Sequence, residues 1–326
     1  MKKNEPKLIS VVLISQQFGK RILILTSICL ALLGSVPTTV SAQRRVAAVS
    51  PSLALTLQTE PNAIVWLDEI RRGVTNVSGK LALLKISAGR HVLRVRANGF
   101  HEVTWPLLPG KRGNLVVPLV RTSDGAELSF QQAEDAREKA KDDESRQSAM
   151  DLYRRALKLR LAFPAAHVGL ARVLMDRNQY QEALAEIEAA RRTRPVYPEA
   201  SAVEGRIYRE MAFADDAAKS FQRAIREARG FQPEAHVGQA RVYEDRGQYE
   251  EAATEYQTAI NQLSDTEPVI YQLLGAAFEK VQKYKEAVTA YENYLQLAPN
   301  GNLAPAVRSI LDQVRRQAAG EELRPD

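Results

Sequence analysis

A repeat with a period of 34 or 35 residues is the feature that most constrains the fold of this chain. Five alanines recur at that spacing, and a large residue follows each of them four positions later. The alanines are Ala149, Ala183, Ala217, Ala252 and Ala287, and the large residues are Tyr153, Ile187, Phe221, Tyr256 and Tyr291. Residues four apart share one helix face, where a small residue admits a second helix and a large one fills the gap. The spacing therefore predicts stacked two-helix units, none of which can bury its apolar face alone.

Prolines begin four of these units, at Pro164, Pro198, Pro233 and Pro268. Proline suits the first position of a helix because its φ is already fixed and its missing N–H would have no partner there. The third unit departs from the pattern at its turn, where Ala214 replaces the tyrosine of the other units. We expect a helical region at residues 130–316, with units at 130–163, 164–197, 198–232, 233–267 and 268–301, and a capping helix at 304–316. Residues 317–326 predict a disordered tail.

In its period, its small-and-large spacing and its opening proline, this region resembles the tetratricopeptide repeat over residues 130–301. The resemblance implies a solenoid that binds a protein or peptide partner in the concave groove lined by the first helix of each unit. In this register three successive units place an arginine on the groove, each followed four residues later by an acid. These pairs are Arg172 with Asp176, Arg206 with Glu210, and Arg241 with Asp245. Either the arginines bind carboxylates of an acidic partner, or each pairs with the acid of its own helix.

Residues 53–121 follow a second pattern, in which apolar residues occupy every other position of short segments. Turn residues interrupt these segments about every ten residues, as in an antiparallel sandwich. Linkers are expected at residues 43–52 and 122–129. The predicted fold class is therefore multidomain α and β, with a small antiparallel β-sandwich followed by an all-α solenoid.

This β-region resembles the PEGA domain over residues 53–120. The family shows a P-x-G-A turn, an apolar strand ending in Asp, a G-x-T step, an A-G-x-H strand entry and a later G-[YF]. The matching segments are Pro61-Asn62-Ala63, residues 64–68, Gly73-Val74-Thr75, Ala88-Gly89-Arg90-His91 and Gly99-Phe100. Here the glycine of the naming motif is missing, and Asn76 stands where the family often has proline. The resemblance implies an extracytoplasmic accessory module without chemistry of its own.

Charge is distributed unevenly along the chain. Residues 43–121 carry twelve basic and four acidic residues, whereas residues 122–326 carry 28 basic and 34 acidic ones. The basic candidates for an anionic surface are Arg71, Arg72, Arg94, Arg96, Lys111 and Arg112. They could face an envelope polymer, phospholipid head groups or the acidic neighbouring domain, or form a solvated face that keeps edge strands from pairing.

The first 42 residues predict a secretory signal peptide. Five basic residues precede an apolar run at residues 22–36, and Val40-Ser41-Ala42 supplies a small-x-small cleavage pattern. The alternative is an uncleaved membrane anchor. Cleavage would also remove Cys29, the single cysteine of the chain. We therefore expect a protein exported across the cytoplasmic membrane, with the periplasm as its destination.

The residue inventory argues against an enzyme. The sequence contains no G-x-S-x-G, phosphate-loop, H-E-x-x-H or EF-hand pattern. Of the four histidines, His167 and His236 occupy equivalent packing positions, and His91 starts a strand, so no metal or cofactor is expected. Export and the acidic helical half argue against nucleic acid. The predicted function is an envelope adaptor that binds a protein partner. The alternative is that the β-region at residues 53–121, called the β-module below, binds cell-wall polysaccharide or an anionic surface, with the helices as a spacer.

Overall fold

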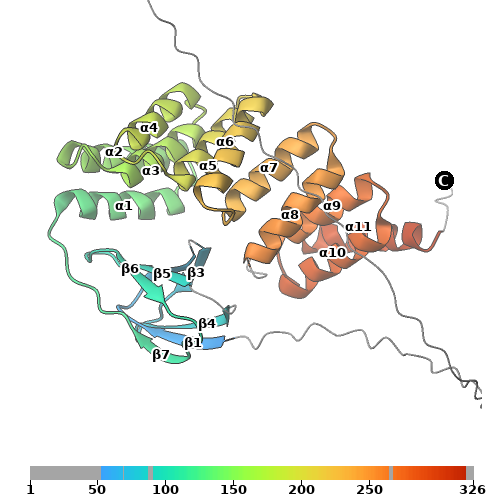
Figure 1. Cartoon of the computed structure of the whole chain (residues 1–326), viewed down its shortest axis with the longest axis horizontal. Coiled ribbons are helices and arrows are strands. Elements are labelled where there is room, and N and C mark those ends of the chain that lie inside the picture. Colours follow the sequence, from blue (N-terminus) through green and yellow to red (C-terminus); the bar gives the residue numbers. More distant parts are fainter. Residues whose placement is uncertain (1–52, 69, 87–90, 264–266, 321–326) are drawn as a thin grey trace, which may run out of the picture. The chain divides into compact units, whose positions relative to one another are not determined.

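The computed structural model describes residues 53–68, 70–86, 91–263 and 267–320 of the chain, and these described residues belong to one compact unit. Seven strands come first and eleven helices follow within the described residues (Figure 1). The strands are β1 Leu53–Gln58, β2 Ile64–Leu67, β3 Ile70–Val74, β4 Lys80–Ile86, β5 His91–Arg96, β6 Val103–Leu107 and β7 Gly113–Val116. The helices are α1 Gly125–Lys139, α2 Asp143–Leu159, α3 Pro164–Asp176, α4 Tyr180–Thr193, α5 Pro198–Glu210, α6 Ala214–Glu227, α7 Pro233–Asp245, α8 Tyr249–Leu263, α9 Val269–Lys280, α10 Tyr284–Leu297 and α11 Ala304–Ala318.

The strands form two sheets, in the orders β4-β1-β7 and β3-β2-β5-β6. Alternation along the strands buries one face of each, so that Leu55, Leu57, Val65, Leu93 and Val95 meet in a shared apolar core. Every pairing is antiparallel except that of β1 with β7, which is parallel. The predicted antiparallel sandwich is thus confirmed as a small β-region with one parallel edge.

Two residues that carry the PEGA resemblance are joined in the structure. His91 Nδ1 lies 2.5 Å from Asp68 Oδ2, and the backbone N–H of Val92 donates to Asp68 Oδ1 at 2.8 Å. Asp68 has a φ of 53°, where the chain leaves β2. The histidine that starts β5 therefore braces the turn after β2.

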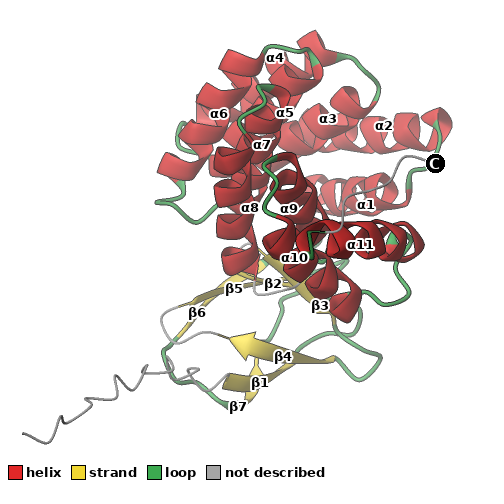
Figure 2. Cartoon of the chain, turned by 90° about the vertical axis from the view of Figure 1, so that its right-hand side faces the viewer, coloured by secondary structure: helices red, strands yellow, loops and turns green. Residues whose placement is uncertain are grey.

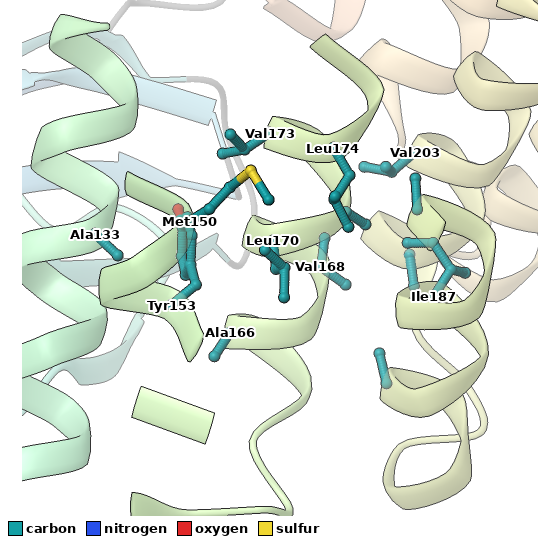
Figure 3. Close-up of a cluster of buried hydrophobic side chains, with 14 of the residues drawn as sticks. Ala133, Met150, Tyr153, Ala166, Val168, Leu170, Val173, Leu174, Ile187 and Val203 are labelled. Atoms are coloured by element: carbon teal, nitrogen blue, oxygen red, sulfur yellow. The ribbon is translucent and has the colours of Figure 1, made fainter. Parts of the chain in front are cut away.

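The helices pack in antiparallel pairs, and the pairs stack side by side (Figures 1 and 2). The five large residues of the repeat are all buried, at most 1% exposed. Figure 3 shows the cluster of the first units, where Tyr153 and Met150 of α2 face Leu170 and Val173 of α3. The ring of Tyr153 lies against Gly169, where an added Cβ would come within 2.3 Å of it. The small-and-large spacing in the sequence therefore marks the helix contacts.

Two helix boundaries differ from the sequence-based expectation. The helix of the first unit begins at Gly125, inside the expected linker of residues 122–129, because Asp124 caps it by accepting hydrogen bonds from Ala126 and Glu127. The capping helix α11 continues to Ala318, two residues further than expected. The turn of the third unit has the geometry of its neighbours, with Ala212 at a φ of 62° where Asn178 has 60°. The predicted signal peptide and the end of the expected tail, residues 321–326, lie outside the described residues.

Candidate protein-binding groove

The first helices of successive units line one surface of the array, and the repeat spacing identifies the equivalent positions on it. Arg172 of α3, Arg206 of α5 and Arg241 of α7 occupy one such position, and Glu138 of α1 precedes Arg172 by the same 34 residues. None of the three expected pairs within a helix forms among the described residues. A basic residue that precedes an acid by four positions is the weaker orientation. Arg172 and Arg206 pair instead with acids of neighbouring units, and Arg241 pairs with Glu244 of its own helix.

Arg172 is a structural link between three helices. Its side chain is only 17% exposed, and its Nη1 donates to Glu199 Oε1 at 2.6 Å while Nη2 lies 3.6 Å from Glu234 Oε2. Burial alone would lower the pKa of Arg172, but Glu199 and Glu234 outweigh it and raise the pKa. Burial likewise raises the pKa of Glu199, and the nearby Arg172 and Arg94 reverse that effect and lower it. Because Glu199 lies on α5 and Glu234 on α7, Arg172 ties α3 to both helices.

The groove remains open in the third and fourth units. Arg206 is 44% exposed and its Nη1 lies 3.3 Å from Glu234 Oε1, and Arg241 pairs with Glu244 three residues later, at 3.0 Å. Two acids of the expected set, Glu210 and Asp245, are about half exposed. Both pair with Arg209, which sequence reasoning did not identify, at 3.7 and 2.9 Å. Asp176 is exposed at the end of α3.

In the first unit the groove positions contact the β-module. The buried side chain of Gln131 on α1 binds the turn between β5 and β6 at two points. Its Oε1 accepts from the N–H of Gly99 at 2.9 Å, and its Nε2 donates to the carbonyl of Phe100 at 2.8 Å. Asn98 of the same turn donates to Asp135 at 2.6 Å. The turn is therefore held by side chains of two helix positions.

A second contact in the first unit is ionic. Glu134 of α1, at the centre of the contact, lies 3.6 Å from Arg96 and 3.4 Å from Arg137, and it accepts a hydrogen bond from Tyr153. Burial raises the pKa of Glu134, but Arg137 and Arg96 together hold it below its ordinary value. Arg96 is itself buried, and its guanidinium stacks on the ring of Trp66. A carboxylate out of water is stable here because two guanidinium groups surround it.

The six basic residues proposed for an anionic surface have different surroundings. Arg94 stacks on Trp66 at 4.2 Å and bonds to Glu102, and Arg71 pairs with Glu138 of α1 at 3.1 Å. Burial lowers the pKa of the half-buried Arg72. Lys111 and Arg112 are exposed in the turn before β7 and make no ion pair with any described residue. Arg71 and Arg96, with Arg94 close to Glu199, thus face the acidic neighbouring domain.

The β-module reaches the far end of the array as well. Ile70 of β3 is buried in one apolar cluster with residues of α7, α8 and α9, among them Ile260 and Ile270. Its contacts therefore run from the first unit to the fourth and fifth, and they leave the side chains of Arg206 and Arg241 44% and 38% exposed. Docking on the acidic domain was one of the alternatives that the charge distribution left open, but Ile70 and Gln131 were not predicted as contacts, because the contacting residues lie far apart in the chain and match no motif.

The equivalent histidines of α3 and α7 bind the helix that follows. His167 Nδ1 lies 2.6 Å from Glu186 and His236 Nδ1 lies 2.6 Å from Glu255. Their Nε2 atoms lie 3.3 Å from the carbonyl of Leu161 and 3.2 Å from that of Gly230. Each histidine therefore connects a helix pair to the loop before it.

The described residues offer no cluster of three or more potential metal ligands. Among their helices, none combines the length and apolar character that a bilayer crossing requires.

Comparisons with known proteins agree on the helical part. Tetratricopeptide-repeat models match residues 141–207, 203–268 and 269–300. The PilF structure from Pseudomonas aeruginosa is 15% identical, covers 60% of this chain and 88% of its own, and has a TM-score of 0.51. A chain of the APC/C hetero-tetramer Cut9–Hcn1 is 15% identical, with coverages of 59% and 37% and a TM-score of 0.50. A tetratricopeptide-repeat protein of Thermus thermophilus is 19% identical, with coverages of 58% and 98% and a TM-score of 0.48.

No curated protein matches the sequence. The likeness to solved structures concerns the fold alone. Tetratricopeptide repeats, which the family models identify here, are typically non-catalytic scaffolds for protein–protein interaction. The period, the packing of the large residues and the family models lead to one assignment. Residues 141–300 are an array of tetratricopeptide repeats.

Proposed function

We propose that the protein is a non-enzymatic adaptor that binds a protein partner through the open part of its groove, in the third and fourth units. The observation that carries this proposal is the exposed set of Arg206, Glu210, Arg241 and Asp245 on successive first helices. The set holds two basic and two acidic residues. Such a surface suits a partner segment with charges of both signs, rather than the purely acidic ligand that a column of arginines alone would favour.

Reversing the two exposed arginines tests this assignment. The variant with Arg206→Glu and Arg241→Glu should lose the partner that the full chain captures from envelope extract, because like charges would then face each other across the contact. A control variant with Arg154→Glu and Lys219→Glu has the same change in net charge. Both of its positions are exposed, on α2 and α6, the second helices of their units. Equal capture by both variants would remove the open groove from the proposal.

We place this adaptor in the cell envelope, as an exported protein with the periplasm as destination. The support is the basic and apolar amino-terminal segment with its Val40-Ser41-Ala42 pattern, together with the resemblance of residues 53–120 to PEGA domains. Cell fractionation with amino-terminal sequencing checks it. A mature chain that begins at Gln43 is the expected result, and an intact terminus in the membrane fraction would favour the uncleaved anchor.

The second candidate function is the binding of anionic envelope polymer by the β-module. The exposed Lys111 and Arg112 favour it. Most of the remaining basic set is engaged by helices or by Glu102, which weakens this candidate. Sedimentation of the full chain with insoluble wall material, with and without Lys111→Glu and Arg112→Glu, distinguishes the two functions.

A further inference from the structure

Three consecutive loops between units share a composition that the other loops lack. They join α2 to α3, α4 to α5 and α6 to α7, and they lie along one edge of the array because every unit repeats the same two-helix path. Residues 158–163, 191–197 and 226–232 together hold seven basic residues and one acidic residue. The helical region as a whole has an excess of acids, so this edge concentrates the opposite charge.

Most of this charge is free of partners within the described residues. Lys158, Arg192, Arg226 and Arg229 make no ion pair there, and Arg194 stacks on Tyr197 without one. The single acid, Glu227, is already bound by Ser201 and Arg191. Arg160 pairs with Asp124 and Arg191 with Glu204, but the other five basic residues of this edge have no ion pair within the described residues, so the edge keeps an excess of positive charge.

Each of the three loops also exposes at least one large apolar side chain beside its basic residues. Leu161 is 81% exposed, Val196 64% and Phe231 38%. Arg160, Arg194 and Arg229 precede them by one or two positions. Single exposed apolar residues are ordinary, but three in successive units, each beside an arginine, form a line along the edge.

The loops are held in place from inside the array. The carbonyl of Leu161 accepts from His167, and the carbonyl of Gly230 accepts from His236 and from Gln262 at 2.8 Å. In the middle loop Arg191 donates to Ser201 at 2.5 Å. The apolar tips therefore project from fixed positions and lose little freedom when a surface covers them.

We propose that this edge docks on the surface of a bilayer that contains anionic phospholipid. Basic residues are attracted to the negative leaflet, and apolar side chains beside them enter the boundary between head groups and acyl chains. A soluble polyanion would engage the arginines but would leave the three apolar tips in water. This inference uses a different surface from the groove and does not depend on the proposed partner.

A fluorophore at one loop tip tests the proposal in the full chain. In a Cys29→Ser background, Val196→Cys is labelled with a polarity-sensitive dye. The dye should shift to shorter wavelength with vesicles of equal parts phosphatidylcholine and phosphatidylglycerol, and not with phosphatidylcholine alone. Val77→Cys is the matched control, because Val77 is 89% exposed in the turn before β4. A dye at position 77 would shift if the amino-terminal segment alone brought the protein to the vesicle. We expect no shift at this position.

Charge reversal supplies the second arm. Arg192→Glu with Arg229→Glu should lower the vesicle affinity roughly tenfold or more, since each basic residue near an anionic leaflet adds attraction. The control Arg154→Glu with Lys219→Glu should leave the affinity unchanged. The proposal is overturned by an equal shift with phosphatidylcholine alone, by an equal shift at Val77, or by a shift with heparin and none with vesicles.

Discussion

Phe221 packs against two glycines of successive units. Adding a single methyl group at one of these glycines should therefore destabilise the fold. A Cβ added at Gly238 would lie 2.3 Å from the ring, and one added at Gly205 would lie 2.7 Å from it. Gly238→Ala should therefore lower the free energy of unfolding by about 1–3 kcal/mol, measured by chemical denaturation. Gly125→Ala is the control, because its Cβ would meet only a flexible methyl of Leu159, at 3.3 Å. Equal losses in the two variants would contradict the packing account.

Ala212 occupies a backbone conformation that suits glycine better. It has a φ of 62°, and Gly247 fills the equivalent place one unit later with a φ of 74°. The left-handed conformation costs an L-residue about 1 kcal/mol, and glycine avoids that cost at some loss of chain entropy. Ala212→Gly should raise the midpoint of denaturant unfolding, whereas Ala212→Val should lower it. A lower midpoint for the glycine variant would argue against this turn geometry.

At the scale of helices, His236 connects α7, α8 and the loop before them, and its link depends on pH. Burial lowers the pKa of His236, but the hydrogen bonds to Glu255 and to the carbonyl of Gly230 raise it above the ordinary value of 6.5. The stabilisation is therefore fully present below about pH 6.5 and is lost as pH rises through the folded-state pKa. His236→Gln should be less stable than the parent at acid pH, with a smaller difference at alkaline pH. A difference that is the same at both pH values in thermal unfolding would refute this.

The helices also show which contacts a sequence can predict. The repeat of small and large residues predicted the stacking, because a helix face has a fixed periodicity and each unit repeats it. The pairing of Arg172 with Asp176 was left open and does not occur, since Glu199 and Glu234 reach the guanidinium from neighbouring units. Docking of the basic β-module on the acidic helices was left open as one alternative, but its contacts were not predicted, because Gln131 and Gly99 approach each other only through tertiary structure.

For the whole molecule, the docked β-module depends on Gln131. Gln131→Ala would leave the partly buried N–H of Gly99 and carbonyl of Phe100 without this partner, at a cost of about 1 kcal/mol. Hydrogen exchange at the Gly99 amide should accelerate. Gln257→Ala, which removes only an exposed contact with Asn261, is the control and should leave that amide unchanged. Slow exchange at Gly99 in the Gln131 variant would show that the two parts are held by other contacts.

Acid should weaken the same contact through Glu134. Because Arg137 and Arg96 overcome the effect of burial, the pKa of Glu134 lies below its ordinary value of 4.5. Its contribution is present above that value and is lost as pH falls through the folded-state pKa. Glu134→Gln should therefore be destabilising near neutral pH, by leaving two guanidinium groups without their carboxylate, and less so below about pH 4. An unfolding free-energy difference that grows in acid would contradict this reasoning.

The most direct test of the adaptor function locates the partner on the array. A photo-crosslinking phenylalanine derivative replaces Arg206 in the groove, or Lys219 on α6, which is 74% exposed. Illumination of cells that produce each full-length variant, followed by mass spectrometry, identifies the adducts. We predict one protein partner that is crosslinked from position 206 and not from position 219. A partner crosslinked from position 219 alone, or no protein adduct at position 206, would contradict binding through the open groove.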